Sequence, residues 1–580
     1  MIILGLNAFY ADSAACLIVD GKLIAAAEEG RFRRINHWGG LPTNAIDYCL
    51  RTGRLNWGDV DHIAINQKPG ANNWRRVGFA LTHRPHPKLI WEQVKNSRRA
   101  ALIKKTLEEH YQISIEGQIH HVEHHLAHIA SAFLVSGFKE AACLSVDGGG
   151  DFASTAFGFG DGGKIRIDNR IYFPHSLGIF YSALTQFLGF PNYGDEHKVM
   201  ELAAHGEPSF LDHMRDLLWI RPNGMFRLSP RYFRHLSDNP FYNWRDDAPH
   251  IEALYRPVLA DLLGAPRKPG EPLEQRHKDI AKSVQTMYEK AFFALLHALH
   301  KQHPSDHLAL AGSCAMNAVA NGKVYRRTPF KKMYLPAATG DAGGAIGAAT
   351  YTLSQINNQG SHFVMENAYL GPESSQQEIH ALLDWKREEV AKSGCSIALI
   401  AGEEELLHKM VQAINDGKVV GWFQGRMEWG PQALGNRSVL ADPRRADMKE
   451  IVNARMKRNE SFRPFAASIL REAVSEWFEQ DDDVPYMNEV FQVRPKHRAL
   501  VPAVAHVDDS GRLQTVQKET NPRYHALISE FFRLSGVPML LSAPFCEDEP
   551  IPCYPEDALG CFLRTEMDVL VLGAFYLQRK

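Results

Sequence analysis

The chain has 580 residues, more than one hydrophobic core supports, so we expect two to four domains. Its hydrophobic (45%) and charged (23%) fractions are ordinary for a globular protein, and its net charge of −2 argues against bulk nucleic-acid binding and polybasic membrane contact. No apolar run approaches the roughly 20 residues that span a bilayer. The first residues, MIILGLNAFYADS, indicate a buried strand and not a signal peptide. We therefore expect a cytoplasmic protein with neither a membrane nor a nucleic-acid partner.

The eight cysteines are scattered and form no CxxC pair. Most lie in apolar surroundings, such as Cys16 in AACLIV and Cys143 in AACLSV. This usage is typical of reduced thiols in the core, so we expect neither a zinc ribbon nor a disulfide framework.

The chain opens on two apolar strands and a third after Asp20-Gly21, a dipeptide typical of a hairpin turn. Residues 142–166 repeat the pattern: an apolar strand, a polar turn with an acid, a strand of small residues, then Asp-Gly and a return strand. The acids are Asp12 in the first unit, and Asp147 and Asp151 in the second. The duplication predicts two similar α/β halves facing a cleft.

Two glycine-rich turns follow, in residues 308–324 and 339–349, and each leads into a helix of small residues. Backbone N–H groups at such turns suit a phosphate or nucleotide. A polar break near residues 355–366 separates this part from a region rich in Arg, Lys and Gly between strands. We therefore predict two α/β domains, 1–355 and 367–580, the second of which handles anions.

Four histidines fall within HVEHHLAHIASAF, residues 121–133. Histidines at i and i+4 share one face of a helix and can bind one metal, and the pairs His121/His125 and His124/His128 have this spacing. If the helix begins near His124, His121 lies in the preceding strand and only the second pair remains. Asp147 and Asp341 could then complete a set of two nitrogen and two oxygen ligands for iron, manganese or zinc. The alternative is a set of surface or hydrogen-bonded histidines.

Motifs along nearly the whole chain resemble those of the nodulation-type and antibiotic O-carbamoyltransferases, which include the tobramycin carbamoyltransferase. They are AEEGRFRRINHW, EHHLAHIASAF, SVDGGGD, FPHSLGIFYSALTQFLGF, GDEHKVMELAAHG, GSCAMNAVANG, TGDAGGAIGAA, GWFQGRMEWGPQALGNRSVLADPR, KRNESFRPFAAS and HVDDSGRLQTV.

The resemblance implies a duplicated actin/sugar-kinase-like (ASKHA) domain followed by a YrdC-like α/β domain. It implies that carbamoyl phosphate and ATP form carbamoyl adenylate in the second domain. The carbamoyl group then passes to a hydroxyl of a secondary metabolite or saccharide in the first domain, beside a divalent metal. Iron(II) is the metal that the resemblance implies, and zinc or manganese would suit the same ligands.

The resemblance also implies roles for individual residues. The metal ligands would be His124, His128, Asp147 and Asp341. The catalytic cations that bind the donor's phosphate groups would be Lys457, Arg463 and Arg512. Further nucleotide or phosphate contacts would come from Lys198 (alternatively part of a structural salt bridge), Gly312, Ser313, Asn317, Arg437 and Ser438.

Four positions depart from the family pattern. Ala11 precedes Asp12 where relatives show His-Asp, and Asn36 precedes His37 where they often show lysine. Gln432 replaces the arginine of GPRALG, and LSAPFC, with Pro544, stands in place of NTSFN. The last two changes remove a cation and a Ser/Asn pair from the donor domain, and a charge-assisted bond to phosphate is a strong one.

These departures keep two alternatives open. One is an enzyme of the same fold with a different donor, or with non-carbamoyl chemistry at the metal. The other is a nucleotide-binding partner protein with an inactive donor domain. A sugar kinase is a further alternative at the level of the fold.

Overall fold

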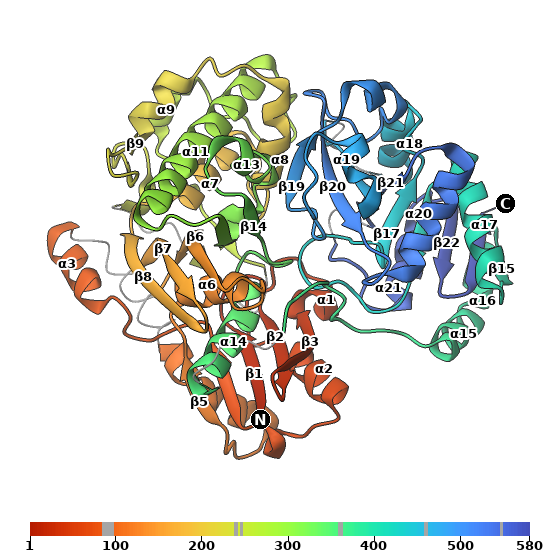
Figure 1. Cartoon of the computed structure of the whole chain (residues 1–580), viewed down its shortest axis with the longest axis horizontal. Coiled ribbons are helices and arrows are strands. Elements are labelled where there is room, and N and C mark those ends of the chain that lie inside the picture. Colours follow the sequence, from red (N-terminus) through yellow and green to blue (C-terminus); the bar gives the residue numbers. More distant parts are fainter. Residues whose placement is uncertain are drawn as a thin grey trace. The chain divides into compact units, whose positions relative to one another are not determined.

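The computed structural model describes residues 1–83, 98–236, 242–243, 248–357, 363–457, 462–545 and 549–579. These residues divide into two compact units, Met1–Met365 and Glu366–Lys580 (Figure 1). Each unit is an α/β structure and is described by itself.

The first sheet of unit 1 has the strand order β3-β2-β1-β4-β5. β1 and β2 pair antiparallel, as do β2 and β3, whereas β1, β4 and β5 run parallel. The hairpin between β2 and β3 turns at Asp20-Gly21, as the sequence predicts. The strands are Ile2–Asn7 (β1), Ala14–Val19 (β2), Lys22–Glu28 (β3), His62–Ile65 (β4) and Gln118–His121 (β5).

The second sheet has the order β14-β13-β6-β7-β8, and its strand directions match those of the first sheet. A three-stranded antiparallel meander is extended by two parallel strands in both sheets. The repeat seen in the sequence is therefore present in the topology. The strands are Glu140–Gly150 (β6), Ala153–Asp161 (β7), Lys164–Tyr172 (β8), His307–Ala311 (β13) and Lys332–Tyr334 (β14).

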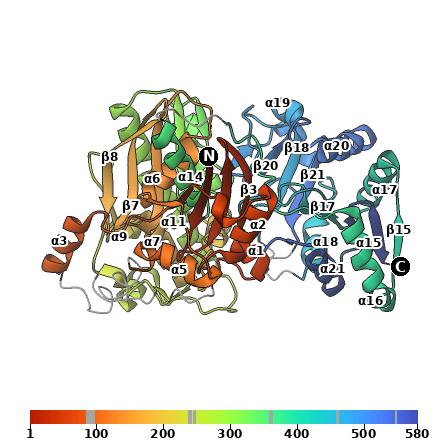
Figure 2. The same cartoon turned by 90° about the horizontal axis from the view of Figure 1, so that it is seen from below.

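Two helices lie between the sheets (Figure 2). α14 (Gly343–Asn357) packs on the first sheet, α6 (His124–Phe133) packs on the second, and the two helices pack on each other. Their approach is close because α14 carries small residues: a Cβ added at Gly347 would lie 1.8 Å from the carbonyl oxygen of Ala127. The small-residue run GDAGGAIGAA thus serves helix packing.

Further helices cover the outer faces of the two sheets. α2 (Thr43–Gly53) packs on β2 and β3 of the first sheet. α7 (Leu177–Phe187) and the long α11 (Gln275–Gln302) pack on β6 of the second sheet. Both sheets are therefore covered on two sides at their centres, and the central strands are correspondingly apolar: β1 is buried from Ile3 onward and β6 from Ala141 to Asp147.

Unit 2 is built on one mixed sheet of nine strands, ordered β15-β23-β22-β16-β17-β21-β18-β20-β19. α17 (Glu403–Asn415) and α20 (Pro522–Ser535) pack together, and α20 contacts β18 and β21. α21 (Pro555–Arg564) contacts β16 and β22, and α18 (Met448–Arg455) precedes β18 in the chain. The strands are Cys395–Leu399 (β15), Val420–Phe423 (β16), Arg437–Ala441 (β17), Ala466–Leu470 (β18), Glu489–Gln492 (β19), Ser510–Val516 (β20), Met539–Pro544 (β21), Val569–Leu572 (β22) and Phe575–Arg579 (β23).

The state of the cysteines and the lengths of the helices bear on two of the expectations drawn from the sequence. Six cysteines in the described part are free, but Cys561 is disulfide-bonded, so the expectation of fully reduced thiols is wrong at that position. Across the residues that the structure describes, no helix combines the length and apolar character needed to cross a bilayer.

Candidate metal centre

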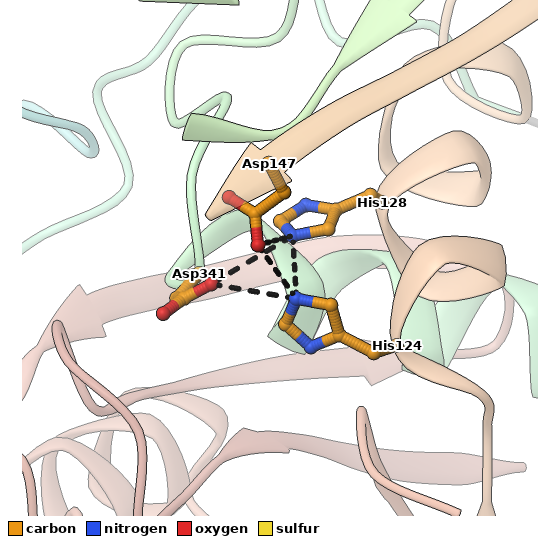
Figure 3. A group of neighbouring side chains, drawn as sticks. All are labelled: His124, His128, Asp147 and Asp341. Atoms are coloured by element: carbon orange, nitrogen blue, oxygen red, sulfur yellow. Dashed lines mark hydrogen bonds and ion pairs between the residues drawn. The ribbon is translucent and has the colours of Figure 1, made fainter. Parts of the chain in front are cut away.

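Two histidines and two aspartates of unit 1 converge on one point (Figure 3). One ligand atom each from His124, His128, Asp147 and Asp341 lies within 4.8 Å of all the others. Nε2 of His124 is 3.1 Å from Oδ2 of Asp147 and 3.6 Å from Oδ1 of Asp341. Nε2 of His128 is 3.9 Å and 3.7 Å from the same two oxygens. The cluster is buried and could bind a metal ion.

The histidines lie in the first turns of α6, which begins at His124, so the condition that selects the His124/His128 pair is met. His121 ends β5 and does not share their face. Two carboxylates fix the beginning of α6: Glu123 accepts a hydrogen bond from the Leu126 amide (2.9 Å), and Asp151 accepts one from the His124 amide (3.0 Å). Acidic groups are favourable at a helix amino end, and here they position the i, i+4 pair.

Asp147 lies near the carboxyl end of β6, and Ser313 follows the neighbouring parallel strand β13. Both the amide of Ser313 (3.0 Å) and its hydroxyl donate hydrogen bonds to Oδ1 of Asp147. This leaves Oδ2 directed at the histidines. The turn requires Gly312, whose φ is +93° and whose added Cβ would lie 2.2 Å from the Val146 carbonyl oxygen.

Asp341 reaches the cluster from the turn that leads into α14. Because α14 packs tightly against α6, the turn is held beside His124 and His128. The backbone carbonyl of Asp341 also accepts a hydrogen bond from Asn66 (3.4 Å), which follows β4 of the first sheet. The four candidate ligands therefore come from elements of both halves of unit 1.

The protonation of the cluster also fits a cation site. Burial lowers the pKa of His124, but its hydrogen bond to Asp147 and the charge of Asp341 outweigh burial and raise it to about 9. Burial and the charge of His124 lower the pKa of His128 to about 4. Burial, with the charge of Asp147, raises the pKa of Asp341 to about 8. The Nε2 atoms of the two histidines are 3.1 Å apart. A proton on His124 is therefore shared among the same side chains that would bind a divalent cation, and metal binding would displace that proton.

Two other predicted residues of unit 1 are already engaged in the structure. Asn317 caps the amino end of a short helix through the Ala320 amide and exchanges two hydrogen bonds with Gln285 (3.0 and 2.9 Å). Lys198 forms an ion pair with Asp195 (3.0 Å), which agrees with the structural alternative named for it.

The three cations predicted to bind the donor lie in unit 2. Lys457 follows α18, has a φ of +54°, and donates from Nζ to the carbonyl of Arg564 (2.8 Å). Arg463 is half-buried just before β18, and Arg512 lies near the start of β20, where Nε donates to the Met487 carbonyl (2.8 Å). β18 and β20 run parallel, so Arg463 and Arg512 lie toward the same edge of the sheet.

Arg437 is fully buried in unit 2, and its side chain is directed at backbone. Its guanidinium donates to the carbonyls of Gln424, Gly425, Asn436 and Pro372 and lies 3.6 Å from the centre of the Phe423 ring. The hydroxyl of buried Ser438 accepts a hydrogen bond from the Gly435 amide (2.9 Å). Both side chains hold the loop before β17 in place.

Of the four departures from the family pattern, Ala11 is fully buried and Asn36 and Gln432 are half-buried, while Pro544 ends β21 and is exposed. Gln432 belongs to a loop whose backbone amides are hydrogen-bonded to the side chain of Glu428. This buried carboxylate accepts three amide hydrogen bonds, from Leu434 (2.9 Å), Asn436 (2.8 Å) and Arg437 (2.9 Å).

Sequence reasoning assigned no role to four acidic or imidazole side chains that the structure shows to be engaged. They are Glu428, Asp151, and the pair that His37 forms with Asp12 at 2.9 Å. For Asp151 and Asp12 the signal was an acid in each repeated turn. For His37 it was a motif quoted in the resemblance. The side-chain partners of Asp12, His37 and Asp151 are 25 or more residues away in the chain, so local pattern could not pair them.

The fold and the site define a two-unit α/β protein with a buried His/Asp cluster suited to a metal ion. Residues 2–350 match the family described as Carbamoyltransferase N-terminus, and residues 411–579 match Carbamoyltransferase C-terminus. The chain therefore belongs to the carbamoyltransferase family and is an enzyme of that family.

Several relatives are similar over most of their length. The chain is 39% identical to protein sll1178 of a Synechocystis strain, over 100% of this chain and 96% of the relative. It is 35% identical to the nodulation protein NolNO of Sinorhizobium fredii, over 99% of this chain and 80% of the relative. It is 28% identical to a 3′-hydroxymethylcephem-O-carbamoyltransferase of Streptomyces clavuligerus, over 67% of this chain and 66% of the relative.

Proposed function

We propose that the protein is an ATP-dependent O-carbamoyltransferase that acts in two steps. Carbamoyl phosphate and ATP first form carbamoyl adenylate and pyrophosphate, and the carbamoyl group then passes to a hydroxyl of a small molecule. The observation that carries the proposal is the buried N₂O₂ cluster, assembled in a chain whose two parts both match carbamoyltransferase domains. Activation makes chemical sense because adenylate is a better leaving group than phosphate.

We assign transfer to residues 1–355 and donor activation to residues 367–580. The matched sheets around two central helices support an actin/sugar-kinase-like fold for the first domain. The mixed sheet and its basic residues are compatible with a YrdC-like second domain.

In the first domain, His124, His128, Asp147 and Asp341 would hold a divalent metal. Two imidazoles and two carboxylates suit iron(II), which the family resemblance favours, and also zinc or manganese. The metal would supply Lewis acidity toward the carbamoyl donor. The chain's own part is to orient the ligands: Ser313 fixes the Asp147 carboxylate, and Asp151 fixes the beginning of α6.

In the second domain, Lys457, Arg463 and Arg512 would bind the anionic groups of carbamoyl phosphate and ATP. Arg437 and Ser438 support this site indirectly, because their polar groups are directed at backbone. In the first domain, the turn at Gly312 and Ser313 offers backbone amides to the nucleotide part of the adenylate, and Asn317 and Lys198 support that region.

The acceptor is a hydroxyl compound, by analogy with the relative that is a 3′-hydroxymethylcephem-O-carbamoyltransferase. We include secondary metabolites and saccharides in the class. The departures at Gln432 and Pro544 favour one alternative, a family enzyme with a changed donor, since the donor domain has there lost a cation and a Ser/Asn pair.

Two measurements test the proposal. The first is release of pyrophosphate from ATP, which should depend on carbamoyl phosphate. The second is the mass of the product formed from a panel of hydroxyl compounds that includes 3′-hydroxymethylcephem, which should increase by one carbamoyl group. Pyrophosphate release without carbamoyl phosphate, or a product of another mass, would show that the donor has changed. Absence of both activities would refute the proposed function.

A further inference from the structure

A second histidine–aspartate pair lies in unit 1, outside the metal cluster. Nδ1 of His37 is 2.9 Å from Oδ1 of Asp12, and the two side chains are 34% and 31% exposed. Within the described part of the chain, nothing hydrogen-bonds to Nε2 of His37. An aspartate at Nδ1 fixes the neutral tautomer that carries its proton on Nδ1, so the lone pair of Nε2 is available.

The pair is linked to the metal cluster by two fully buried asparagines. Asn7 donates to the backbone carbonyl of Asp12 (2.9 Å). Asn66 donates to Oδ1 of Asn7 (3.1 Å) and to the carbonyl of Asp341 (3.4 Å). Asn7 and Asn66 stand at the carboxyl ends of the parallel strands β1 and β4. The His37–Asp12 pair and the ligand Asp341 are thus anchored to the same edge of the first sheet.

The other face of His37 meets the loop before α8 (Glu196–Leu202). The ring of Tyr193 packs edge-on at 5.1 Å between centroids. The next residue is Gly194, with a φ of +91°, and an added Cβ there would lie 2.3 Å from Nε2 of His37. A side chain at this position would collide with the ring, so glycine allows the loop to pack closely against His37, whose side chain still stays about one-third exposed (34%).

We propose that His37 is the general base that accepts the proton of the acceptor hydroxyl, and that Asp12 is the residue that positions it. The inference rests on the proposed function and adds the residue that activates the acceptor. In this step the hydroxyl oxygen forms a bond to the carbamoyl carbon, and its proton passes to Nε2 of His37. The bond between that carbon and the phosphate oxygen of AMP breaks, and its electron pair leaves with AMP.

The charges around His37 set the pH range in which it can act as a base. Burial lowers its pKa, but the carboxylates of Asp12 and Glu196 outweigh burial and the opposing charge of Arg31, so the net pKa is raised above 6.5. Tyr193, which also packs on the ring, has a raised pKa and stays neutral. The base form is therefore lost as the pH falls through this raised pKa, and transfer to an alcohol should fall with it.

The test compares two nucleophiles in the full-length enzyme with ATP and carbamoyl phosphate. An alcohol, 3′-hydroxymethylcephem or glycerol at high concentration, must lose a proton as it attacks. Hydroxylamine is nucleophilic when neutral and would trap the activated carbamoyl group as hydroxyurea without a strong base. We expect His37→Gln to lower transfer to the alcohol at least about 100-fold, in the range of general-base effects. Hydroxyurea formation, pyrophosphate release and metal content should stay within about 3-fold of wild type.

His303→Gln is the matched control, because His303 forms a similar pair with Asp168 (2.6 Å) and is assigned no role in the reaction. It should behave as wild type. Asp12→Asn should also slow transfer to the alcohol. The rate of transfer to the alcohol should no longer fall at acidic pH in His37→Gln. A purely structural role of His37 would not remove this pH dependence.

Equal loss of both nucleophile reactions in His37→Gln, or full retention of alcohol transfer, would overturn the inference while leaving the proposed function intact. If the wild type forms hydroxyurea but modifies neither alcohol, transfer to hydroxyls fails, and this inference fails with it. If the wild type forms neither pyrophosphate nor hydroxyurea, the proposed donor chemistry itself is wrong.

Discussion

The position of the His124 ring depends on the absence of a side chain at Gly150. A Cβ added there would lie 2.2 Å from the imidazole, whereas one added at Gly148 would meet nothing within 4 Å. We expect Gly150→Ala to displace His124 and weaken metal binding about 10- to 100-fold, the usual range for changes that disturb ligand orientation. Metal titration of both variants measures this, and equal affinity in Gly150→Ala and Gly148→Ala would contradict it.

The histidine ligands themselves give a second prediction. His128→Ala removes one of the four candidate ligands and one of the two imidazoles of the cluster. We expect it to abolish metal binding and acceptor carbamoylation, with the circular dichroism spectrum unchanged. Metal analysis of the purified variant and a transfer assay provide the readouts. Full transfer activity in metal-free wild type would disprove the role of the site.

At the scale of elements, the approach of α14 to α6 holds Asp341 beside the histidines. Gly347→Ala would place a methyl group 1.8 Å from the Ala127 carbonyl oxygen, so the two helices must separate. We expect a destabilisation of about 1–3 kcal/mol, as for other overpacked interiors. Gly78→Ala in α3 (Asn73–His83), where an added Cβ meets nothing within 4 Å, is the control and should be neutral or slightly stabilising. Chemical denaturation measures both, and equal stability of the two variants would count against this packing.

A substitution in the loop before β17 can show whether Arg437 has a structural role or binds the donor. Arg437→Met would leave the carbonyls of Gln424 and Gly425 without their donor, whereas those of Asn436 and Pro372 still accept from backbone amides. Each buried unsatisfied group costs about 1–3 kcal/mol. We expect loss of several kcal/mol of stability, with the KM for carbamoyl phosphate nearly unchanged in the protein that remains folded. A large rise in KM with unchanged stability would instead place Arg437 at the donor.

The sequence was most informative where function depends on local spacing. The i, i+4 spacing singled out His124 and His128 if a helix began near His124, as α6 does, and the repeated strand–turn–strand pattern predicted the duplicated topology. The sequence was less informative about Arg437, whose carbonyl partners come from residues 372, 424, 425 and 436. Separate backbone segments, the farthest at Pro372, surround the guanidinium, and a sequence pattern does not reveal this arrangement. The pairing of His37 with Asp12 was hidden for the same reason.

At the scale of the whole molecule, the two units should separate the two half-reactions. We expect Arg512→Ala to stop pyrophosphate release, because we assign donor activation to cations of unit 2. His124→Ala should leave pyrophosphate release intact and stop only transfer to the acceptor. Both half-reactions are measured in both variants. Equal loss of both activities in each variant would show that the work is not divided between the units in this way.

The central claim, metal-dependent carbamoyl transfer to a hydroxyl at the N₂O₂ cluster, is tested most directly by following isotope-labelled carbamoyl phosphate into product. The wild-type enzyme is stripped of metal, divided, and assayed by mass spectrometry with and without added iron(II), in the presence of ATP and the hydroxyl panel. We predict labelled O-carbamoyl product only after iron is restored, and none from His128→Ala under either condition. Labelled product at the full rate from stripped wild type, or from His128→Ala, would contradict the account.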